Sequence, residues 1–471
     1  MLHKRSEKGQ ALVMIALAAV GLFAFTALSV DGGMVFSDKR HAQNAADTAA
    51  LAAALARVRA QTGPDAAAIS AGIARASSNG YDNDVDSAVE VNICNEPGIV
   101  CEALPVNANK SEYIRVKIVS TIPLTFARII GRTSFTNQVT AVAKAKLGGP
   151  SPIFDGAALV ALAPSGSKTI TFQGNPNLDI NNSGVFDNSS SACAFDYGGN
   201  ITVNADTGYT VASGGTSCAN GNAMQGNITN SSMFQSGTQI PYPPKFDFPD
   251  PSISCSGTGK ITADGTAGHY TVHPGSYTNL DLKNGVFTLV NGSYCVSNGI
   301  SISPGTLVTA NYVDILLTGG EFKVQGSFNC DYFLLHSKGG SGYTTNATSS
   351  VVCTNATFFM STGKFYAEGT GAGTYTAPQT GFHPEYANLL VYLPYGNTSP
   401  LKITGNSGSE ITGSIIGVSA PVEIHGNTNS EVNSSIVGYT VTVTGNATTT
   451  INYIPDDQVI EIDPNSIGLT K

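Results

Sequence analysis

The chain has 471 residues, of which 52 are glycine and only 12% are charged, and its formal net charge is −9. This length allows two or three domains, and the glycine-rich, charge-poor composition favours short strands and tight turns. The acidic balance gives no electrostatic reason to bind nucleic acid, which we exclude as a partner. Acidic residues predominate after residue 147 and no arginine follows Arg132, which indicates two parts with different roles.

Residues 10–30 contain no charged side chain. As a helix this run would be about 31 Å long, enough to cross the hydrocarbon core of a bilayer. Basic residues precede it and Asp31 follows it, so the positive-inside rule predicts a cytoplasmic N-terminus and an exported body. We expect residues 1–30 to form a cytoplasmic stub and a single-pass anchor in the inner or cytoplasmic membrane, with a periplasmic or extracellular body. The anchor is defined by Gln10, Leu17, Leu22 and Val30.

Processing of the N-terminus is the alternative to a retained anchor. Ala27-Leu28-Ser29 resembles the small-residue cleavage site of a signal peptide, but the apolar run exceeds the usual length of about 7–15 residues. Cleavage at Gly9 in the manner of prepilins is a second alternative. Met14 stands five positions later, however, where type IV pilins usually carry glutamate. Both comparisons favour retention.

An alanine-rich helix is predicted over residues 34–59, because alanine has the highest helix propensity and nothing interrupts the run before Gly63-Pro64. A second short helix is expected over residues 65–77. Small side chains form a stripe on the first helix that allows close helix packing. We expect this stripe to bind a partner protein, with packing inside the protein as the alternative. It consists of Ala45, Ala46, Ala49 and Ala53.

Three sequence marks lie in this region: Gly9-Gln10-Ala11-Leu12, Val30-Asp31-Gly32-Gly33, and Gln43-Asn44-Ala45-Ala46-Asp47 with Ala49-Ala50-Leu51. With them, residues 8–54 resemble the N-terminus of the TadE/TadG-like family of tight-adherence (Flp) pilus assembly proteins. The resemblance implies a component of a pilus or surface apparatus that is tethered to the inner membrane. Its partners would be the membrane and pilus assembly or surface proteins. The fold and role of the rest of the chain do not follow from this resemblance.

Residues 81–147 alternate between polar and apolar side chains in three runs, 85–93, 113–121 and 136–146, which predicts strands. Together with the helices they indicate a small α+β module over residues 31–147. Asp82, Asp84 and Asp86 begin like a calcium loop, but Ser87 and Ile93 replace the required glycine and glutamate. We therefore expect a solvated turn there.

The rest of the chain is predicted to be β-structured and divided by a proline-rich segment. We expect an upstream β region over residues 148–240, a linker over 241–256, and a right-handed parallel β-helix over 257–471. From Leu280 onwards, units of about seven residues each end in a turn at glycine or asparagine, and such short strands must stack on their neighbours. This part also resembles the β-helical ectodomains attached to TadG-like anchors; an array of β-sandwiches is the alternative. The predicted interior residues are Leu282, Leu289, Val296, Ile302, Ile315 and Val324.

Eight cysteines are present, without a C-x-x-C pair or a neighbouring histidine that would indicate zinc. An even number in an exported chain favours disulfides, with buried free thiols as the alternative. Pairing between sequence neighbours is the simplest arrangement: Cys94–Cys101, Cys193–Cys218, Cys255–Cys295 and Cys330–Cys353.

Catalytic chemistry is weakly indicated. Asp456-Asp457 is the only adjacent carboxylate pair in the body, and neighbouring strand residues point to opposite faces. Asp187, Ser189 and Ser191 match the D-x-S-x-S of a metal-dependent adhesion site, but the alternating strands and helices of that fold are not predicted here. We expect no catalytic, cofactor or metal site. The predicted function is a membrane-anchored structural or adhesive component of a pilus apparatus, with surface glycans as a further candidate partner. The alternative is a carbohydrate-active enzyme or a polysaccharide-binding β-helix protein.

Overall fold

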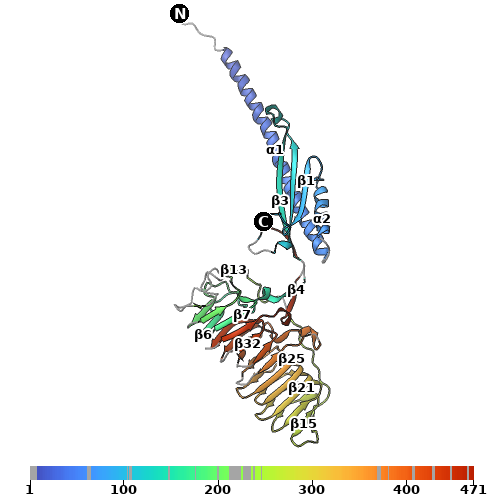
Figure 1. The fold of residues 1–471 in the computed structure, drawn as a ribbon, viewed down its shortest axis with the longest axis vertical. Coiled ribbons are helices and arrows are strands. Elements are labelled where there is room, and N and C mark those ends of the chain that lie inside the picture. Colours follow the sequence, from blue (N-terminus) through green and yellow to red (C-terminus); the bar gives the residue numbers. More distant parts are fainter. Residues whose placement is uncertain are drawn as a thin grey trace. The chain divides into compact units, whose positions relative to one another are not determined.

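The computed structural model is mainly β, with one long N-terminal helix (Figure 1). It describes residues 8–470, apart from 61–64, 103, 105–108, 147–148, 175–176, 199–200, 212–223, 226–234, 237–238, 245–246, 369–372, 380, 406–408, 427–429, 446–447 and 464–465. The chain forms two compact units: Met1–Pro150 with Ile462–Lys471, and Ser151–Glu461.

The first unit combines two helices with a four-stranded antiparallel sheet. Helix α1 (Lys8–Ala60) includes both the predicted anchor and the alanine-rich helix in one uninterrupted element, and α2 (Ala66–Ser77) follows it. The strand order is β1-β2-β3-β36, and α1 packs on β2 and β3. The strands are β1 (Ser87–Ile93), β2 (Tyr113–Pro123), β3 (Ser134–Lys146) and β36 (Ser466–Leu469). The predicted α+β module is therefore confirmed. We call the part of the first unit that follows Val30 the N-terminal module.

Strand β36 corrects one expectation. The sequence placed all of residues 257–471 in a β-helix, but Ser466–Leu469 pairs with β3, where Lys146 faces Ser466 and Ala143 faces Leu469. A strand with one neighbour leaves half of its backbone groups unpaired, so a distant segment can complete the edge. No local sequence signal reports such a pairing.

The second unit is a β-solenoid, in which parallel strands stack coil on coil. Strands three apart in sequence pair in its most regular part, as β15 with β18 and β16 with β19, so each coil there contributes three strands. All six predicted interior residues are buried in its main core, which confirms the repeat. The remaining strands of the chain are β4 (Gly149–Pro152), β5 (Leu159–Ala161), β6 (Ile170–Gly174), β7 (Asn177–Asn181), β8 (Gly184–Asp187), β9 (Phe195–Gly198), β10 (Ile201–Asn204), β11 (Thr207–Thr210), β12 (Met224–Gln225), β13 (Gln235–Ser236), β14 (Ile261–Ala263), β15 (His269–Val272), β16 (Gly275–Tyr277), β17 (Leu280–Leu282), β18 (Val286–Leu289), β19 (Gly292–Val296), β20 (Ile300–Ile302), β21 (Leu307–Leu317), β22 (Glu321–Val324), β23 (Ser327–Ser337), β24 (Gly342–Thr345), β25 (Ser350–Met360), β26 (Lys364–Ala367), β27 (Thr374–Thr376), β28 (Leu389–Leu393), β29 (Leu401–Gly405), β30 (Glu410–Thr412), β31 (Ser414–Gly426), β32 (Ser430–Asn433), β33 (Ile436–Gly445), β34 (Thr448–Asn452) and β35 (Ile460–Asp463).

Glycines at the coil corners explain part of the repeat. Gly320 and Gly342 both have positive φ, and a Cβ at either position would lie less than 2.5 Å from backbone atoms of the neighbouring coil. Only glycine allows both the left-handed conformation and this close approach. At these two positions, glycine is thus required by the stacking of coils.

The order of coils in space differs from their order in the sequence. Strand β33 pairs with β5 and β6, and β34 pairs with β7, so the upstream coils stack directly on the C-terminal coils. The two β regions expected on either side of the proline-rich segment therefore form one solenoid. The backbone N–H and C=O groups along the open edge of the last coil are paired by strands of the first coils. Local sequence patterns cannot predict this pairing.

The proline-rich segment packs along the outer face of the solenoid instead of linking two domains. We call its described residues, 239–244 and 247–255, the strap. Its tyrosine and phenylalanine side chains pack against a second core cluster on that face. The Tyr392 hydroxyl donates to the Asp247 carboxylate at 2.8 Å, and the Tyr386 hydroxyl donates to the Pro249 carbonyl at 2.6 Å. Cys255 ends the strap in a disulfide with Cys295.

Candidate functional site: the anchoring helix and its module

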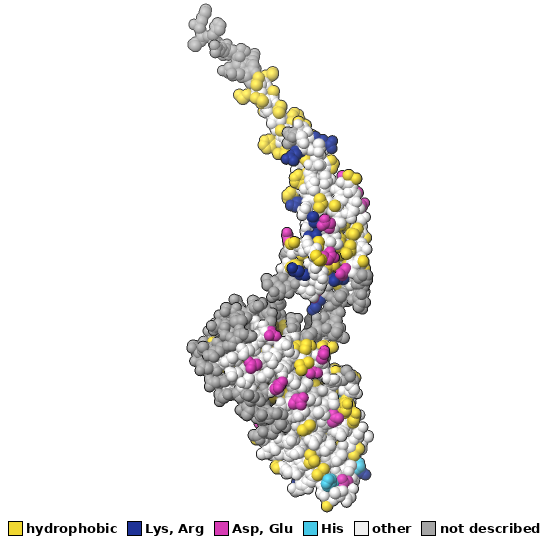
Figure 2. Space-filling model, in the orientation of Figure 1, with side chains coloured by type: hydrophobic (Ala, Val, Ile, Leu, Met, Phe, Trp, Pro, Cys, Tyr) yellow, Lys and Arg dark blue, Asp and Glu magenta, His cyan; other side chains and the backbone are white. Residues whose placement is uncertain are grey.

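The N-terminal part of α1 exposes a continuous apolar surface. Residues 11–30 are almost all exposed, including Leu17 and Leu22 near the middle of the predicted anchor and Val30 at its end, and Figure 2 shows hydrophobic side chains along this segment. Among the described residues, α1 is the one helix that is long and apolar enough to cross a membrane. Gln10 lies in the same helix. This single N-terminal helix indicates a membrane anchor.

Two hydroxyl groups in this segment are satisfied by the helix itself. Thr26 donates to the carbonyl of Leu22 at 2.9 Å, and Ser29 donates to that of Phe25 at 2.8 Å. A hydrocarbon environment offers no water to such groups, so internal bonds of this kind are what a membrane segment needs.

The alanine stripe lies in the core of the N-terminal module. Ala45, Ala46, Ala49 and Ala53 are fully or almost fully buried in the module's hydrophobic core. Gly72 of α2 lies so close that a Cβ there would be 3.3 Å from the Ala53 Cβ. The prediction that this stripe binds a partner is therefore wrong. Small side chains do allow close packing, but the surfaces they meet are α2 and the module's own sheet.

Asp31 marks the boundary between the apolar segment and the module. Its buried carboxylate accepts hydrogen bonds from the backbone N–H groups of Thr125 (2.9 Å), Phe126 (3.0 Å) and Ala127 (2.7 Å). Burial alone would raise the pKa of Asp31, but these three donors hold that pKa below its ordinary value. The carboxylate thereby fixes the loop between β2 and β3 to the end of the anchor.

Asp38 makes a second connection about two turns further along the same face of α1. Its carboxylate accepts from the Ser120 hydroxyl at 3.0 Å, from the Asn137 amide at 2.6 Å and from the Tyr81 hydroxyl at 3.4 Å. Burial, together with the negative charge of Asp38, raises the pKa of Tyr81 to about 12. The phenol therefore stays protonated and continues to donate. These bonds fix α1 to both β2 and β3.

The helix that carries these contacts is similar to part of a known protein family. Residues 9–56 match the family model described as putative Flp pilus-assembly TadE/G-like. Neither the comparison with curated proteins nor that with solved structures finds a match for the chain. The TadE/G-like segment thus covers the apolar segment, Asp31, Asp38 and the buried alanines, and it ends before α2.

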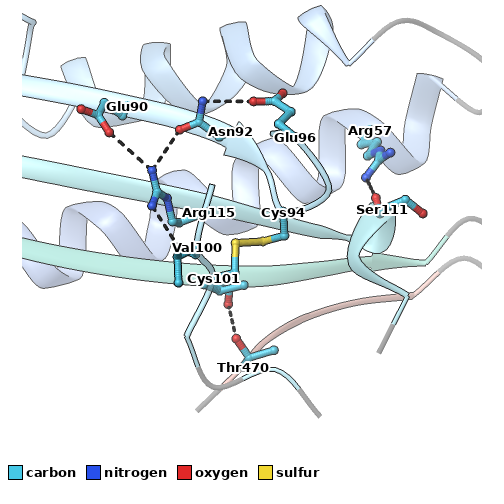
Figure 3. Close-up of a disulfide and its surroundings, with 11 residues drawn as sticks. Arg57, Glu90, Asn92, Cys94, Glu96, Val100, Cys101, Ser111, Arg115 and Thr470 are labelled. Atoms are coloured by element: carbon cyan, nitrogen blue, oxygen red, sulfur yellow. Dashed lines mark hydrogen bonds and ion pairs between the residues drawn. A yellow bond between two sulfur atoms is a disulfide. The ribbon is translucent and has the colours of Figure 1, made fainter. Parts of the chain in front are cut away.

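A disulfide closes the module at the end of the sheet opposite the β2–β3 loop (Figure 3). Cys94 and Cys101 are bonded, as expected for sequence neighbours. The Arg115 guanidinium donates to the Val100 carbonyl at 3.1 Å and to the Asn92 side chain at 3.3 Å, so the short loop is held on β1 and β2.

Two further predicted pairs are confirmed in the solenoid, Cys255–Cys295 and Cys330–Cys353. The last pair joins residues that face each other on neighbouring strands β23 and β25. In the fourth predicted pair, Cys193–Cys218, residue 218 lies outside the described residues. The three bonds fasten a loop, the end of the strap and two coils.

The acidic motifs singled out in the sequence have structural partners. Both oxygens of the buried Asp187 carboxylate accept from the Thr169 hydroxyl, at 2.8 and 2.9 Å, and one accepts from the Ser189 N–H at 3.1 Å. Burial raises the pKa of Asp187 to about 6. Asp84 accepts from Ser87 at the start of β1. Asp456 and Asp457 lie in a short 3-10 helix, where Asp456 is exposed and Asp457 is half-buried. Throughout the described ranges, His, Cys, Asp and Glu do not gather in groups of three that would suit a metal.

One partly exposed aromatic cluster on the solenoid was not recognised in the sequence. Tyr312 and Tyr332 stack with ring centroids 4.4 Å apart, and Phe382 lies edge-on to both. His383 follows Phe382 and bonds Asp314 at 2.9 Å. The two tyrosines are 20 residues apart, close to one coil, but without knowing the register of the coils this spacing could not reveal the stack.

Proposed function

We propose that this protein is a membrane-anchored, extracytoplasmic structural component of a tight-adherence (Flp-type) pilus or surface apparatus. The match of residues 9–56 supports association with such a system. In this proposal the apolar segment of α1 retains the chain at the inner or cytoplasmic membrane, and the solenoid is held outside the cytoplasm as a stalk or binding surface.

One observation carries this proposal. Helix α1 continues without interruption from an exposed apolar segment into the core of a folded module. The first 20 residues after Gln10 span about 30 Å as a helix, which matches the hydrocarbon core. The next 30 residues bury alanines against a sheet and contribute Asp31 and Asp38 to it. Because one continuous helix forms both parts, the membrane segment fixes the position of the module directly beside the membrane.

The proposed orientation rests on charge and on the disulfides. Lys4, Arg5 and Lys8 precede the apolar segment, which favours a cytoplasmic N-terminus. The disulfides of the module and the solenoid suit an oxidising compartment. Both arguments support a body outside the cytoplasm.

The topology can be tested with a reporter that is active only outside the cytoplasm, fused after Lys471. We expect activity from the native chain and its loss in the Leu17→Arg/Leu22→Arg variant, because each central arginine costs about 2.5–3.5 kcal/mol on insertion. A Val85→Arg/Val100→Arg variant adds the same charge at exposed module positions and should remain active. Unchanged export of the Leu17/Leu22 variant would contradict the anchor.

Association with pilus components needs a separate test. Crosslinking of the full chain in intact cells, followed by purification and mass spectrometry, should recover proteins of the pilus assembly system. The Leu17→Arg/Leu22→Arg variant serves as the control that has lost its membrane position. Adducts that contain no pilus or surface component in a piliated strain would refute this part of the proposal.

We also propose that the solenoid acts by binding and not by catalysis, with surface glycans as the ligand class. The support is the Tyr312–Tyr332–Phe382 cluster, in which Tyr312 is exposed and the other two rings are half-buried, since accessible aromatic side chains provide rigid, amphipathic contact area. The rival function is a carbohydrate-active enzyme. Incubation of the full chain with host and matrix polysaccharides distinguishes them: we expect retention of a glycan that Tyr312→Ala weakens, without release of fragments. Turnover of a polysaccharide would overturn the proposal.

A further inference from the structure

The loop between β2 and β3, residues 124–133, lies against α1 at the end of the apolar segment. We call it the tip loop. Three of its backbone N–H groups donate to Asp31, the first residue after the apolar run. The loop is therefore fixed at the level where the anchor would leave the hydrocarbon core. Figure 1 shows this end of the β2–β3 hairpin beside α1, toward its N-terminus.

Apolar side chains of the tip loop extend back along the anchor. Phe126, Ala127 and Ile129 line an open hollow of about 290 Å³ together with Asp31 and the apolar Ala24, Ala27 and Leu28 of α1. At 1.5 Å per residue, Ala24 lies about 10 Å along the helix from Asp31, on the membrane side. Ile129 is 87% exposed and Phe126 is 41% exposed. In water this arrangement would leave a large apolar patch uncovered next to an already apolar helix.

Basic side chains stand beside these apolar ones. Arg128 lies in the short 3-10 helix Ala127–Ile130, and Arg132 follows it; both are exposed. Neither has a carboxylate partner within the described part of the chain. Exposed Arg next to inserted Phe and Ile is the pattern of an interfacial segment, in which the cations meet lipid phosphates. Lys and Arg side chains are visible where the module meets the apolar segment (Figure 2).

We propose that the tip loop is a second membrane contact, in which Phe126 and Ile129 insert among lipid acyl chains and Arg128 and Arg132 bind headgroup phosphates. A bilayer surface is the occupant that fits, because the hollow is continuous with the anchor and opens at the same depth. Asp31 then holds together two membrane contacts of one module. Two points of attachment, unlike one helix alone, fix the tilt of the module relative to the membrane.

The absence of tryptophan from the chain allows a direct test. Single tryptophans are introduced into the full chain as Ile129→Trp, or Phe126→Trp as a second tip position, and the protein is reconstituted into phosphatidylcholine vesicles with and without phosphatidylglycerol. We expect blue-shifted emission, strong quenching by lipids brominated on the acyl chain, and weak quenching by aqueous acrylamide. Val100→Trp is the matched control, because Val100 is 71% exposed at the opposite end of β2. Brominated lipid should quench the tip positions several-fold more than this control.

A positive control separates this proposal from the anchor itself. Leu22→Trp lies within the apolar segment and should be quenched by brominated lipid. If it is not, the anchor fails; if Leu22→Trp is quenched and both tip positions behave like Val100→Trp, only the tip-loop contact fails. Shielding of the tip from both quenchers would indicate a protein occupant, which also overturns the proposal. Arg128→Gln/Arg132→Gln should reduce the tip quenching several-fold in vesicles with phosphatidylglycerol, and an unchanged value would refute the headgroup contact.

Discussion

Polar residues on α1 determine how the helix sits on its sheet. Alanines at Ala45, Ala46 and Ala49 give a smooth surface on which several registers would pack almost equally well. Asp31 and Asp38 remove this ambiguity, because each carboxylate meets its donors in one position only. An unpaired buried carboxylate would be costly, so the alternative registers are disfavoured. Within the segment that matches the TadE/G-like model, Asp31 and Asp38 thus have a structural role.

Asp187 shows the opposite effect of burial on a carboxylate. The folded protein raises its pKa to about 6, above the value near 3.9 of an unfolded chain. The folded state therefore binds this proton more tightly than the unfolded state between about pH 4 and pH 6. The contribution of Asp187 to stability is fully present below about pH 4 and is lost as the pH rises through about 6.

We predict that Asp187→Asn removes this dependence. The native solenoid should lose about 2–3 kcal/mol between pH 4 and pH 7 that the variant keeps, because the neutral amide cannot ionise. Guanidinium unfolding of the full chain in detergent at several pH values measures the difference. Asp281→Asn, at an exposed strand position, is the control and should leave the slope unchanged. An identical slope in Asp187→Asn would contradict the assignment.

At the scale of the element, the buried face of α1 explains the run of alanines. Only side chains of this size let α2 approach as closely as Gly72 and Ala53 do. Larger side chains would force the helices apart or into strained rotamers. The alanine face of α1 therefore indicates close packing against another element. In this protein that element belongs to the same module.

We predict that Ala46→Leu and Ala49→Leu each destabilise the N-terminal module by about 1–3 kcal/mol through overpacking. The measurement is thermal unfolding of the full chain in detergent. Hydrogen exchange of the amides of β2 reports on the first unit separately. Ala52→Leu makes the same change at a half-buried position of the same helix and should cost less. Undiminished protection of β2 in the two core variants would show that the stripe is not part of the core.

The strap is an element without regular secondary structure that still has a defined position. Prolines deprive it of backbone donors, so it cannot join a sheet and instead contributes side chains and carbonyls to the solenoid surface. Tyr392 and Tyr386 hold its middle, and the disulfide Cys255–Cys295 holds its end. This disulfide closes a loop with a sequence separation of 40.

We predict that Cys255→Ser/Cys295→Ser lowers the stability of the solenoid by about 2–4 kcal/mol, because a loop of this length gains much freedom in the unfolded state. Limited proteolysis should also cut the strap near Pro251 sooner than in the native chain. Cys94→Ser/Cys101→Ser removes the disulfide that closes a much shorter loop in the other unit. This variant should leave the unfolding of the solenoid unchanged. Equal protease resistance of the strap with and without its disulfide would argue against its fastening role.

At the scale of the whole molecule, the chain enters and leaves the solenoid at one place. The first coils stack on the last ones, and β4 pairs with β35 in a separate two-stranded sheet. The C-terminal residues can therefore return to the N-terminal module, where β36 covers part of β3. The module is complete only when the whole chain has been made.

We predict that deletion of residues 464–471 destabilises the N-terminal module by roughly 1–3 kcal/mol, because backbone hydrogen bonds on β3 lose their partners. Hydrogen exchange should accelerate at Ala143–Lys146, which face β36, while the solenoid strands keep their protection. An exposed strand edge should also promote association of the truncated chains. Unaltered exchange at Ala143–Lys146 would refute this role of β36.

Features that repeat or persist locally could be predicted from the amino-acid sequence. The apolar run from Gln10 to Val30 is long and uninterrupted, which indicates a helix. The alanine-rich helix and the seven-residue units from Leu280 each carry a local pattern that indicates their secondary structure. Disulfides between sequence neighbours were predictable for the same reason, since short separations are closed at least cost.

The surfaces that these elements meet depend on the tertiary fold. The alanine stripe looked equally suited to a partner and to a core, because helix periodicity defines a face but not what covers it. The stacking of β33 on β5, the return of β36 to β3 and the position of the strap join residues that are far apart in the chain. The tip loop's place beside the anchor likewise depends on Asp31 reaching backbone groups 94 to 96 residues away. Contacts between such distant residues form because unpaired backbone donors and acceptors need partners and apolar surface needs to be buried. A local sequence pattern does not show which distant segment will meet these needs.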